Sequence, residues 1–93
     1  MSETAFAIAW TAASRRALTG LPEKAATAVV EFAYGSLAAS PYRAGQPLKL
    51  GLEGLHSARR GDYRVIYRID DYQHQVTVAA IEHRSDVYRP RSR

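Results

Sequence analysis

Apolar and polar residues alternate with a period of two in several short stretches of the chain. In residues 5–10, AFAIAW, the large side chains of Phe6, Ile8 and Trp10 alternate with alanine, so they would share one face of a β-strand. Residues 63–69 alternate in the same way, and the Gly-Asp pair before them is a turn signal. We predict strands over residues 5–10, about 54–60, 63–69 and about 75–82.

Two helices are predicted between the first and second strands. Thr11 is a suitable N-cap for a helix over about 12–19, which Gly20 would end. Pro22 has the fixed φ angle that suits the first turn of the next helix, over about 22–38. This second helix has a broad apolar face that could lie on a sheet. We therefore expect a helical hairpin.

The segment 41–47, PYRAGQP, contains two prolines and a glycine, and we predict a loop there. The predicted order of elements is then β-α-α-β-β-β. Helices followed by hairpin-linked strands are typical of the α+β class, with the helical hairpin packed on one face of a mostly antiparallel four-stranded sheet. A chain of this length forms one domain, which we assign to residues 1–93 with a basic tail at about 84–93.

The composition is that of an ordinary globular protein, with 46% apolar and 24% charged residues. The absence of cysteine excludes disulfides and thiolate metal sites. His56, His74 and His83 lie far apart in sequence and lack metal-binding spacing, and no phosphate-binding glycine loop is present, so we predict no metal or cofactor. The apolar stretches are too short for a signal peptide or a membrane span, and we expect a cytoplasmic protein that binds no membrane.

Basic residues are concentrated in two parts of the chain. Thirteen Lys and Arg residues against nine Asp and Glu residues give a net charge of +4. Residues 59–68 and residues 84–93 each contain four arginines and a single aspartate. Such concentration favours a polyanionic partner, either a nucleic acid or an acidic protein.

The arginines inside the predicted strand 63–69 suggest a specific chemistry. With Tyr63, Val65, Tyr67 and Ile69 facing the core, Arg64 and Arg68 point the other way. Metal-free RNA cleavage needs a base, fixed positive donors for the phosphate and an acid for the departing oxygen. If the last two strands are neighbours, four residues could converge to supply these groups: Arg64, His83, Arg84 and Tyr88.

Each of these residues also has a purely structural interpretation. Arg68 is followed closely by Asp70 and Asp71, and we interpret it as a solvated surface charge. Arg64 fits either a solvated sheet face or a phosphate contact. His83 could simply end a strand, and Tyr88 could be a core anchor.

Further candidates for RNA contacts lie near the same strands. His56 could share a surface with Arg64, or it could be a structural imidazole. Arg59 and Arg60 flank a turn, where solvated charge is common, but Arg59 would lie beside Arg64. Lys49 is a candidate phosphate contact. We group His56, Arg59, Arg60 and Lys49 as candidate RNA-binding residues.

Three segments carry a resemblance to a known family: LPEK at residues 21–24, LEGLHSARRGDYRVIYRID at 52–70 and HRSDVYR at 83–89. They resemble the RelE superfamily of toxins from bacterial toxin-antitoxin systems, and the second segment is especially similar to mycobacterial RelE toxins. The resemblance implies a toxin that enters the ribosomal A site and cleaves mRNA there without a metal. It also implies an acidic RelB-like antitoxin as a partner, with promoter DNA bound only through the antitoxin complex.

The resemblance also assigns roles to individual residues. Arg64 matches the strand arginine that stabilises the phosphate, Arg84 matches a second catalytic arginine, and Tyr88 matches the C-terminal tyrosine near the scissile nucleotide.

The general base is left open by the resemblance. Leu55 and Ser57 stand where the enteric RelE pattern has lysines, and Gln46 stands where a YoeB-like glutamate would be. We take His83 as the first substitute for the base and His56 as the second.

Two other functions remain alternatives. ParE-like toxins share the fold, poison DNA gyrase and lack ribonuclease activity, and Tyr88 within HRSDVYR favours the ribonuclease branch. A non-catalytic basic module that binds nucleic acid by charge would explain the arginines, but it gives no reason for grouping His83 and Arg84 with this tyrosine.

Overall fold

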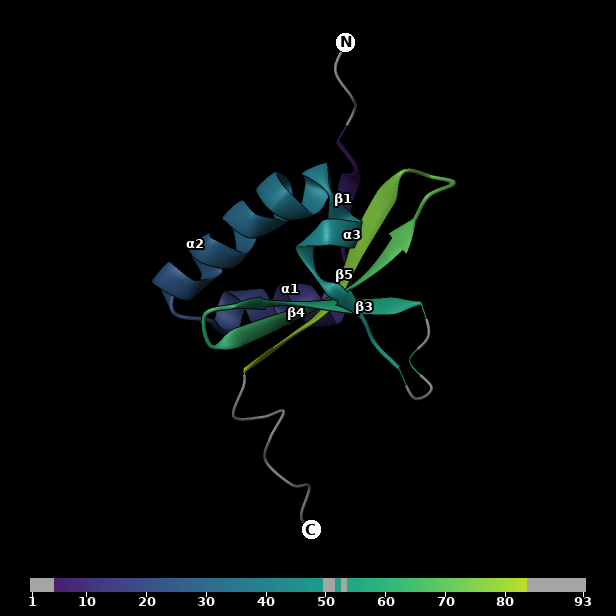
Figure 1. Ribbon diagram of the computed structural model, residues 1–93. Coiled ribbons are helices and arrows are strands. Elements are labelled where there is room, and N and C mark those ends of the chain that lie inside the picture. Colours follow the sequence, from purple (N-terminus) through teal and green to yellow (C-terminus); the bar gives the residue numbers. More distant parts are fainter. Residues whose placement is uncertain (1–4, 50–51, 53, 84–93) are drawn as a thin grey trace.

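The computed structural model describes residues 5–49, 52 and 54–83, and these form a five-stranded sheet with helices on one side (Figure 1). The sheet order is β1-β5-β4-β3-β2; β1 runs parallel to β5, and the other neighbouring strands are antiparallel. The elements in chain order are β1 (Ala7–Trp10), α1 (Ala12–Gly20), α2 (Glu23–Phe32), the π-helical turn η1 (Ala33–Leu37), α3 (Pro41–Ala44), β2 (Gln46–Pro47), β3 (Leu55–Arg60), β4 (Tyr63–Asp70) and β5 (Gln75–His83).

The predicted α+β class is confirmed, but the sheet has one strand more than predicted. The additional strand is β2, whose two residues Gln46 and Pro47 pair with Ser57 and His56 of β3. The expectation of a continuous loop over 41–47 is therefore wrong. Pro41 begins the short helix α3, where a missing N–H costs nothing, and Pro47 lies in an edge strand, where one side of the backbone needs no partner.

The helical hairpin forms as the sequence predicts. The Thr11 hydroxyl caps α1 by accepting a hydrogen bond from the backbone N–H of Ser14 at 3.1 Å. Pro22 lies immediately before α2, and the helical path continues from α2 through η1 to residue 39. The predicted second helix therefore contains a π-helical turn that its apolar pattern did not reveal.

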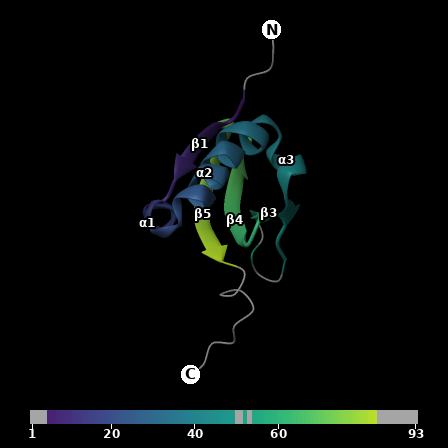
Figure 2. The same cartoon turned by 90° about the vertical axis from the view of Figure 1, so that its left-hand side faces the viewer.

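Both long helices cover the same face of the sheet. Figure 2 shows α2 in front of β4 and β5, with α1 beside β5. Val29 and Phe32 of α2 are buried against strand residues that alternate along β4 and β5, as period two requires. The buried cluster comprises Val29, Phe32, Ala33, Leu37, Ala58, Val65, Tyr67, Val76 and Val78.

A β-bulge in β5 changes which of its residues face the helices. Tyr67 is opposite Val78 and Ile66 is opposite Ala80, so Ala79 has no counterpart on β4. Because of this extra residue, Val76, Val78 and Ile81 all pack on the helix side. Regular alternation would not allow this for Val78 and Ile81, because an odd number of positions separates them. Glu82, which follows Ile81, therefore points away from the helices. Strict alternation counted from Val76 would have placed Glu82 on the helix side.

Candidate functional site

The face of the sheet turned away from α1 and α2, which we call the outer face, carries a row of three charged residues. Arg59 of β3 lies opposite Arg64 of β4, and Arg64 lies opposite Glu82 of β5. Two like charges directly opposite one another on neighbouring strands are unfavourable, so the arginine pair does not serve folding. The outer face consists of Leu55, Ser57, Arg59, Arg64, Ile66, Arg68, Thr77, Ala80 and Glu82.

The ion pair of Arg64 with Glu82 does not use all the hydrogen-bond donors of the guanidinium group. Its Nη2 atom is 3.9 Å from Oε1 of Glu82, and the two side chains are 34% and 44% exposed. A pair this long and this exposed contributes only about 0–1 kcal/mol to stability. The Nε atom of Arg64 is buried and has no hydrogen-bond partner among the described residues. A guanidinium whose only described ion pair is this long and this exposed is suited to bind a phosphate in place of Glu82.

A pocket of about 300 Å³ adjoins the two arginines on the side of β2. Gln46 and Ser57 line it together with Arg59 and Arg64, so polar neutral residues lie beside the positively charged ones. Gly45 also lines this pocket, and a Cβ atom there would collide with the carbonyl oxygen of Ser57. Glycine at this position allows α3 and β2 to come close to β3 and form the wall of the pocket.

His83 does not lie on the same face as Arg64. It is opposite Tyr63 across the strand pair, and the two rings meet edge to face with centroids 5.0 Å apart. Because Tyr63 and Arg64 are consecutive strand residues, their side chains point to opposite faces. We expected the side chains of His83 and Arg64 to lie close together, but in the described part of the chain they lie on opposite faces of the sheet.

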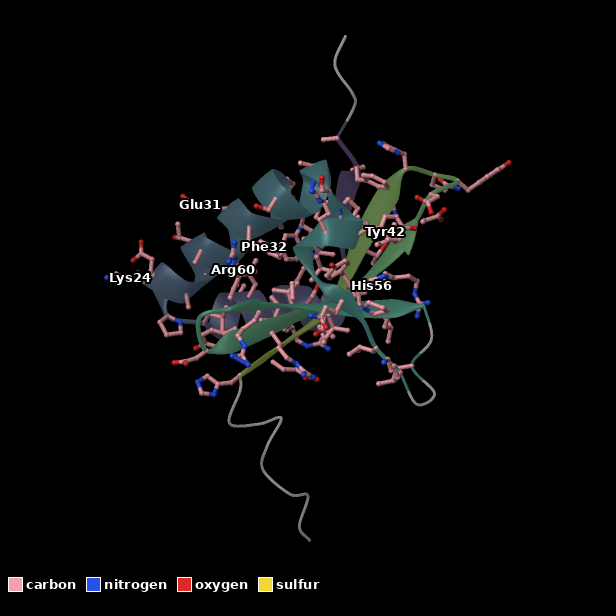
Figure 3. The ribbon with its side chains drawn as sticks, viewed as in Figure 1. Lys24, Glu31, Phe32, Tyr42, His56 and Arg60 are labelled. Atoms are coloured by element: carbon pink, nitrogen blue, oxygen red, sulfur yellow. The ribbon has the colours of Figure 1, made fainter. Side chains whose placement is uncertain are left out.

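His56 also lies on the helix side, in an aromatic cluster (Figure 3). Its ring stacks on Tyr67 with centroids 5.5 Å apart and meets the edge of Tyr42 at 5.8 Å. The Tyr67 hydroxyl donates to the carbonyl oxygen of Pro41 at 2.7 Å, and burial raises the pKa of Tyr67 to about 12. The Tyr42 hydroxyl donates to the carboxylate of Asp71, and this hydrogen bond raises the pKa of Tyr42. The geometry supports the structural interpretation of His56.

The other candidates are distributed over both faces. Arg60 points to the helix side, where its guanidinium lies over the ring of Phe32 with the central carbon 4.5 Å from the centroid (Figure 3). Arg68 is exposed on the outer face, opposite Leu55, as expected for a surface charge. Lys49 is exposed in the connection after β2.

Arg84 and Tyr88 lie outside the described residues.

Glu82 was not singled out from the sequence as a site residue. The signal that could have found it is the odd spacing between the apolar residues Val78 and Ile81, which predicts a bulge and so reverses the faces of the last strand residues.

A larger pocket, of about 470 Å³, lies on the other side of Arg59, against the helices. Arg43 and Arg60 line it with Arg59, so positive charge continues around this edge of the sheet.

Within the described ranges, no group of three or more His, Asp or Glu side chains is placed to hold a metal ion. The helices described here are also too short or too polar to cross a membrane.

Sequence comparison places this chain among known toxins. Residues 8–88 match the profile of a family described as the ParE toxin of the type II toxin-antitoxin system parDE. The Toxin RelE of Mycobacterium tuberculosis is 56% identical over 82 residues, which cover 88% of this chain and 84% of that protein. The chain belongs to the RelE/ParE family of type II toxins. The Toxin RelG of the same organism is 46% identical over 84 residues, covering 90% of this chain and 97% of that protein.

Solved structures of RelE/ParE toxins have the same fold. The toxin-antitoxin complex RelBE2 from M. tuberculosis contains a chain that is 44% identical with a TM-score of 0.84, covering 91% of this chain and 98% of that one. The isolated Escherichia coli RelE toxin gives a TM-score of 0.71 at 16% identity and covers 90% of this chain and 92% of that one, so it shares the fold alone. The similarity to mycobacterial RelE toxins expected from the sequence motifs is therefore confirmed.

Proposed function

We propose that this toxin is a ribosome-dependent endoribonuclease that cleaves mRNA without a metal ion and so inhibits translation. The observation that supports it best is the cross-strand pair of Arg59 and Arg64 on the outer face, beside a polar pocket. The pair is unfavourable for the free protein, and a phosphate between the two guanidinium groups would convert the repulsion into binding.

Arginine on a rigid strand is suited to stabilise the transition state of this reaction. Negative charge grows on the phosphate oxygens when the 2′-oxygen attacks phosphorus, and a planar guanidinium can donate two hydrogen bonds to them. In this proposal Arg64 provides the main contact and Arg59 the second positive charge. The sequence resemblance adds Arg84 as a second phosphate contact and Tyr88 as a residue that orients or stacks on the substrate.

We propose an acidic RelB-like antitoxin as the partner that inhibits the toxin. The positive charge of the chain favours an acidic protein, and RelE and RelB toxin-antitoxin pairs are described in crystal structures from M. tuberculosis, Pyrococcus horikoshii and E. coli. Ribosome and mRNA would be the targets in the cytoplasm, and promoter DNA would be bound only through the antitoxin complex.

The test compares Arg64→Ala with Arg68→Ala. Both arginines are on the outer face of β4, but only Arg64 lines the pocket and lies beside Arg59. We expect Arg64→Ala to lower the cleavage rate about 10²- to 10³-fold, as for loss of one preorganised donor to a transition-state oxyanion. Arg68→Ala should cleave like the wild type. The readout is primer extension on translated mRNA after brief induction, with antitoxin binding as the check on folding.

Cuts within codons of the translated region that disappear in Arg64→Ala would support the proposal. Full toxicity of this variant would refute the role of Arg64.

The family description and the similarity to a Pseudomonas aeruginosa ParDE system, with a TM-score of 0.67 at 18% identity, make a ParE-like gyrase poison the second candidate. Intact mRNA together with gyrase-linked DNA breaks would establish that alternative. Binding to RNA without either effect would instead indicate a non-catalytic basic module.

A further inference from the structure

Glu82 is a carboxylate placed directly beside the arginine that the proposed function assigns to the phosphate. The bulge at Ala79 brings Glu82, and not His83, into register with Arg64 on the outer face. The ion pair between Glu82 and Arg64 is long, at 3.9 Å, and the Glu82 side chain is 44% exposed. Such a pair contributes little to folding, so the carboxylate is available for chemistry.

We propose that Glu82 is the general base of RNA cleavage, the group that takes the proton from the attacking 2′-hydroxyl. This inference rests on the proposed function. It fills the role that the sequence left open, because both histidines considered for it lie on the helix side of the sheet, opposite Tyr63 and Tyr67.

The distance between Glu82 and Arg64 suits this role. A phosphate bound by Arg64 would replace Glu82 as the partner of Nη2 and leave the carboxylate next to the bound nucleotide. The nearest free hydroxyl to that phosphorus is the 2′-hydroxyl of the nucleotide whose 3′-oxygen is bonded to it. A general base must come within about 2.6–3.2 Å of the hydroxyl whose proton it removes, and a side chain that already reaches Arg64 can make this contact.

The local charges offset the repulsion between Glu82 and a phosphate. A carboxylate and a phosphate alone would repel each other. Arg59 and Arg64 supply two positive charges in the same row, which balance one negative charge on Glu82 and one on the phosphate. The arginine pair thus explains how a base and an anionic substrate could occupy the same face.

The reaction step balances without a cofactor. The proton of the 2′-hydroxyl passes to the Glu82 carboxylate while the 2′-oxygen forms a bond to phosphorus. The bond from phosphorus to the 5′-oxygen breaks, and the departing 5′-oxygen takes a proton from water or a protonated side chain. The products are a 2′,3′-cyclic phosphate and a 5′-hydroxyl end, and Glu82 then returns its proton to the solvent.

The test uses single-turnover cleavage of mRNA on ribosomes that carry an empty A site. Glu82→Gln keeps the shape of the side chain and removes its basicity. We expect a rate about 10²- to 10⁴-fold below that of the wild type, the range typical of losing a general base. Glu82→Asp should retain part of the rate, and formate should restore part of the rate of Glu82→Ala. Glu31→Gln is the matched control, because Glu31 is exposed on α2, on the helix side of the sheet (Figure 3).

Binding is measured separately from cleavage, with an mRNA that carries a 2′-deoxynucleotide at the cleavage site and therefore has no nucleophile. Glu82→Gln should bind this RNA-ribosome complex as tightly as the wild type or more tightly, since Arg64 loses a competing partner. Cleavage by Glu82→Gln at a rate near that of the wild type would overturn the inference and leave Glu82 as a counter-ion only. A loss of binding that accounts for the whole loss of rate would also overturn it.

These outcomes are distinguishable from failure of the proposed function. If the wild-type toxin leaves the mRNA intact under the same conditions, the ribonuclease function itself is refuted, and the role of Glu82 with it. If the wild type cleaves and Arg64→Ala does not, while Glu82→Gln cleaves normally, the function stands and only the assignment of the base falls.

Discussion

The hydroxyl of Thr11 donates a hydrogen bond to the carbonyl oxygen of Ala79, at 2.9 Å, and so joins the start of α1 to the bulge in β5. The same oxygen accepts a hydrogen bond from the backbone N–H of Ser14 and caps the helix. One side chain therefore satisfies an unpaired helix N–H and the carbonyl of the bulged residue. The bulge in turn determines that Glu82 shares a face with Arg64.

Replacing Thr11 by valine should destabilise the protein by about 1–2 kcal/mol, because valine keeps the shape but loses both hydrogen bonds. Thr11→Ser retains the hydroxyl and should stay within about 0.5 kcal/mol of the wild type. Urea unfolding followed by circular dichroism measures both values. Equal stability of the valine and serine variants would mean that the cap and the bulge contact contribute nothing.

His56→Phe should leave cleavage unchanged and should not reduce stability. The Nδ1 atom of His56 is buried and has no hydrogen-bond partner among the described residues, and a phenyl ring can keep the stack on Tyr67. Removing an unsatisfied buried nitrogen can stabilise a protein by about 1 kcal/mol. Thermal unfolding and the ribosome cleavage assay provide the two measurements. A stable variant that no longer cleaves would restore His56 as a candidate catalytic residue.

Tyr67→Phe should cost about 1 kcal/mol at neutral pH, because the carbonyl of Pro41 loses its donor. Alkaline pH should reduce this difference. Burial raises the pKa of Tyr67 from 10 to about 12 in the folded protein, so above pH 10 the unfolded chain releases the phenol proton first. The stabilisation by Tyr67 is complete below pH 10 and is lost as the pH rises towards 12. Urea unfolding of both proteins from pH 8 to pH 11 tests this, and a constant difference would contradict it.

Gly45→Ala should destabilise the protein by about 1–3 kcal/mol, the usual cost of forcing an additional methyl group into a packed site. The new Cβ atom would collide with the carbonyl oxygen of Ser57 and would lie 2.6 Å from the hydroxyl of Tyr67. Gly35→Ala is the matched control, because a Cβ atom at that position would meet no described heavy atom within 4 Å apart from its own stretch of helix and its chain neighbours. If Gly45→Ala unfolds at the same urea concentration as the control, Gly45 does not pack closely against Ser57.

The apolar pattern predicted much of the fold because it reports directly which side chains avoid water. Alternation along β4 correctly placed Val65 and Tyr67 in the core and Arg64 on the opposite face. The edge strand β2 was missed, since a strand of two residues has no period to detect and its proline suggested a loop. The helix ends were predicted well, because caps and breakers act through neighbouring residues.

By itself the sequence determined the α+β class, the order of the main elements and the family, and it singled out Arg64 as a candidate site residue. The tertiary structure alone decided which residues stand beside Arg64, because register and bulges depend on packing between strands that are distant in sequence. An extra residue at Ala79 turned His83 towards Tyr63 and placed Glu82 beside Arg64. The odd spacing between Val78 and Ile81 indicates a bulge, but only the pairing of β4 with β5 shows that Glu82, and not His83, lies opposite Arg64.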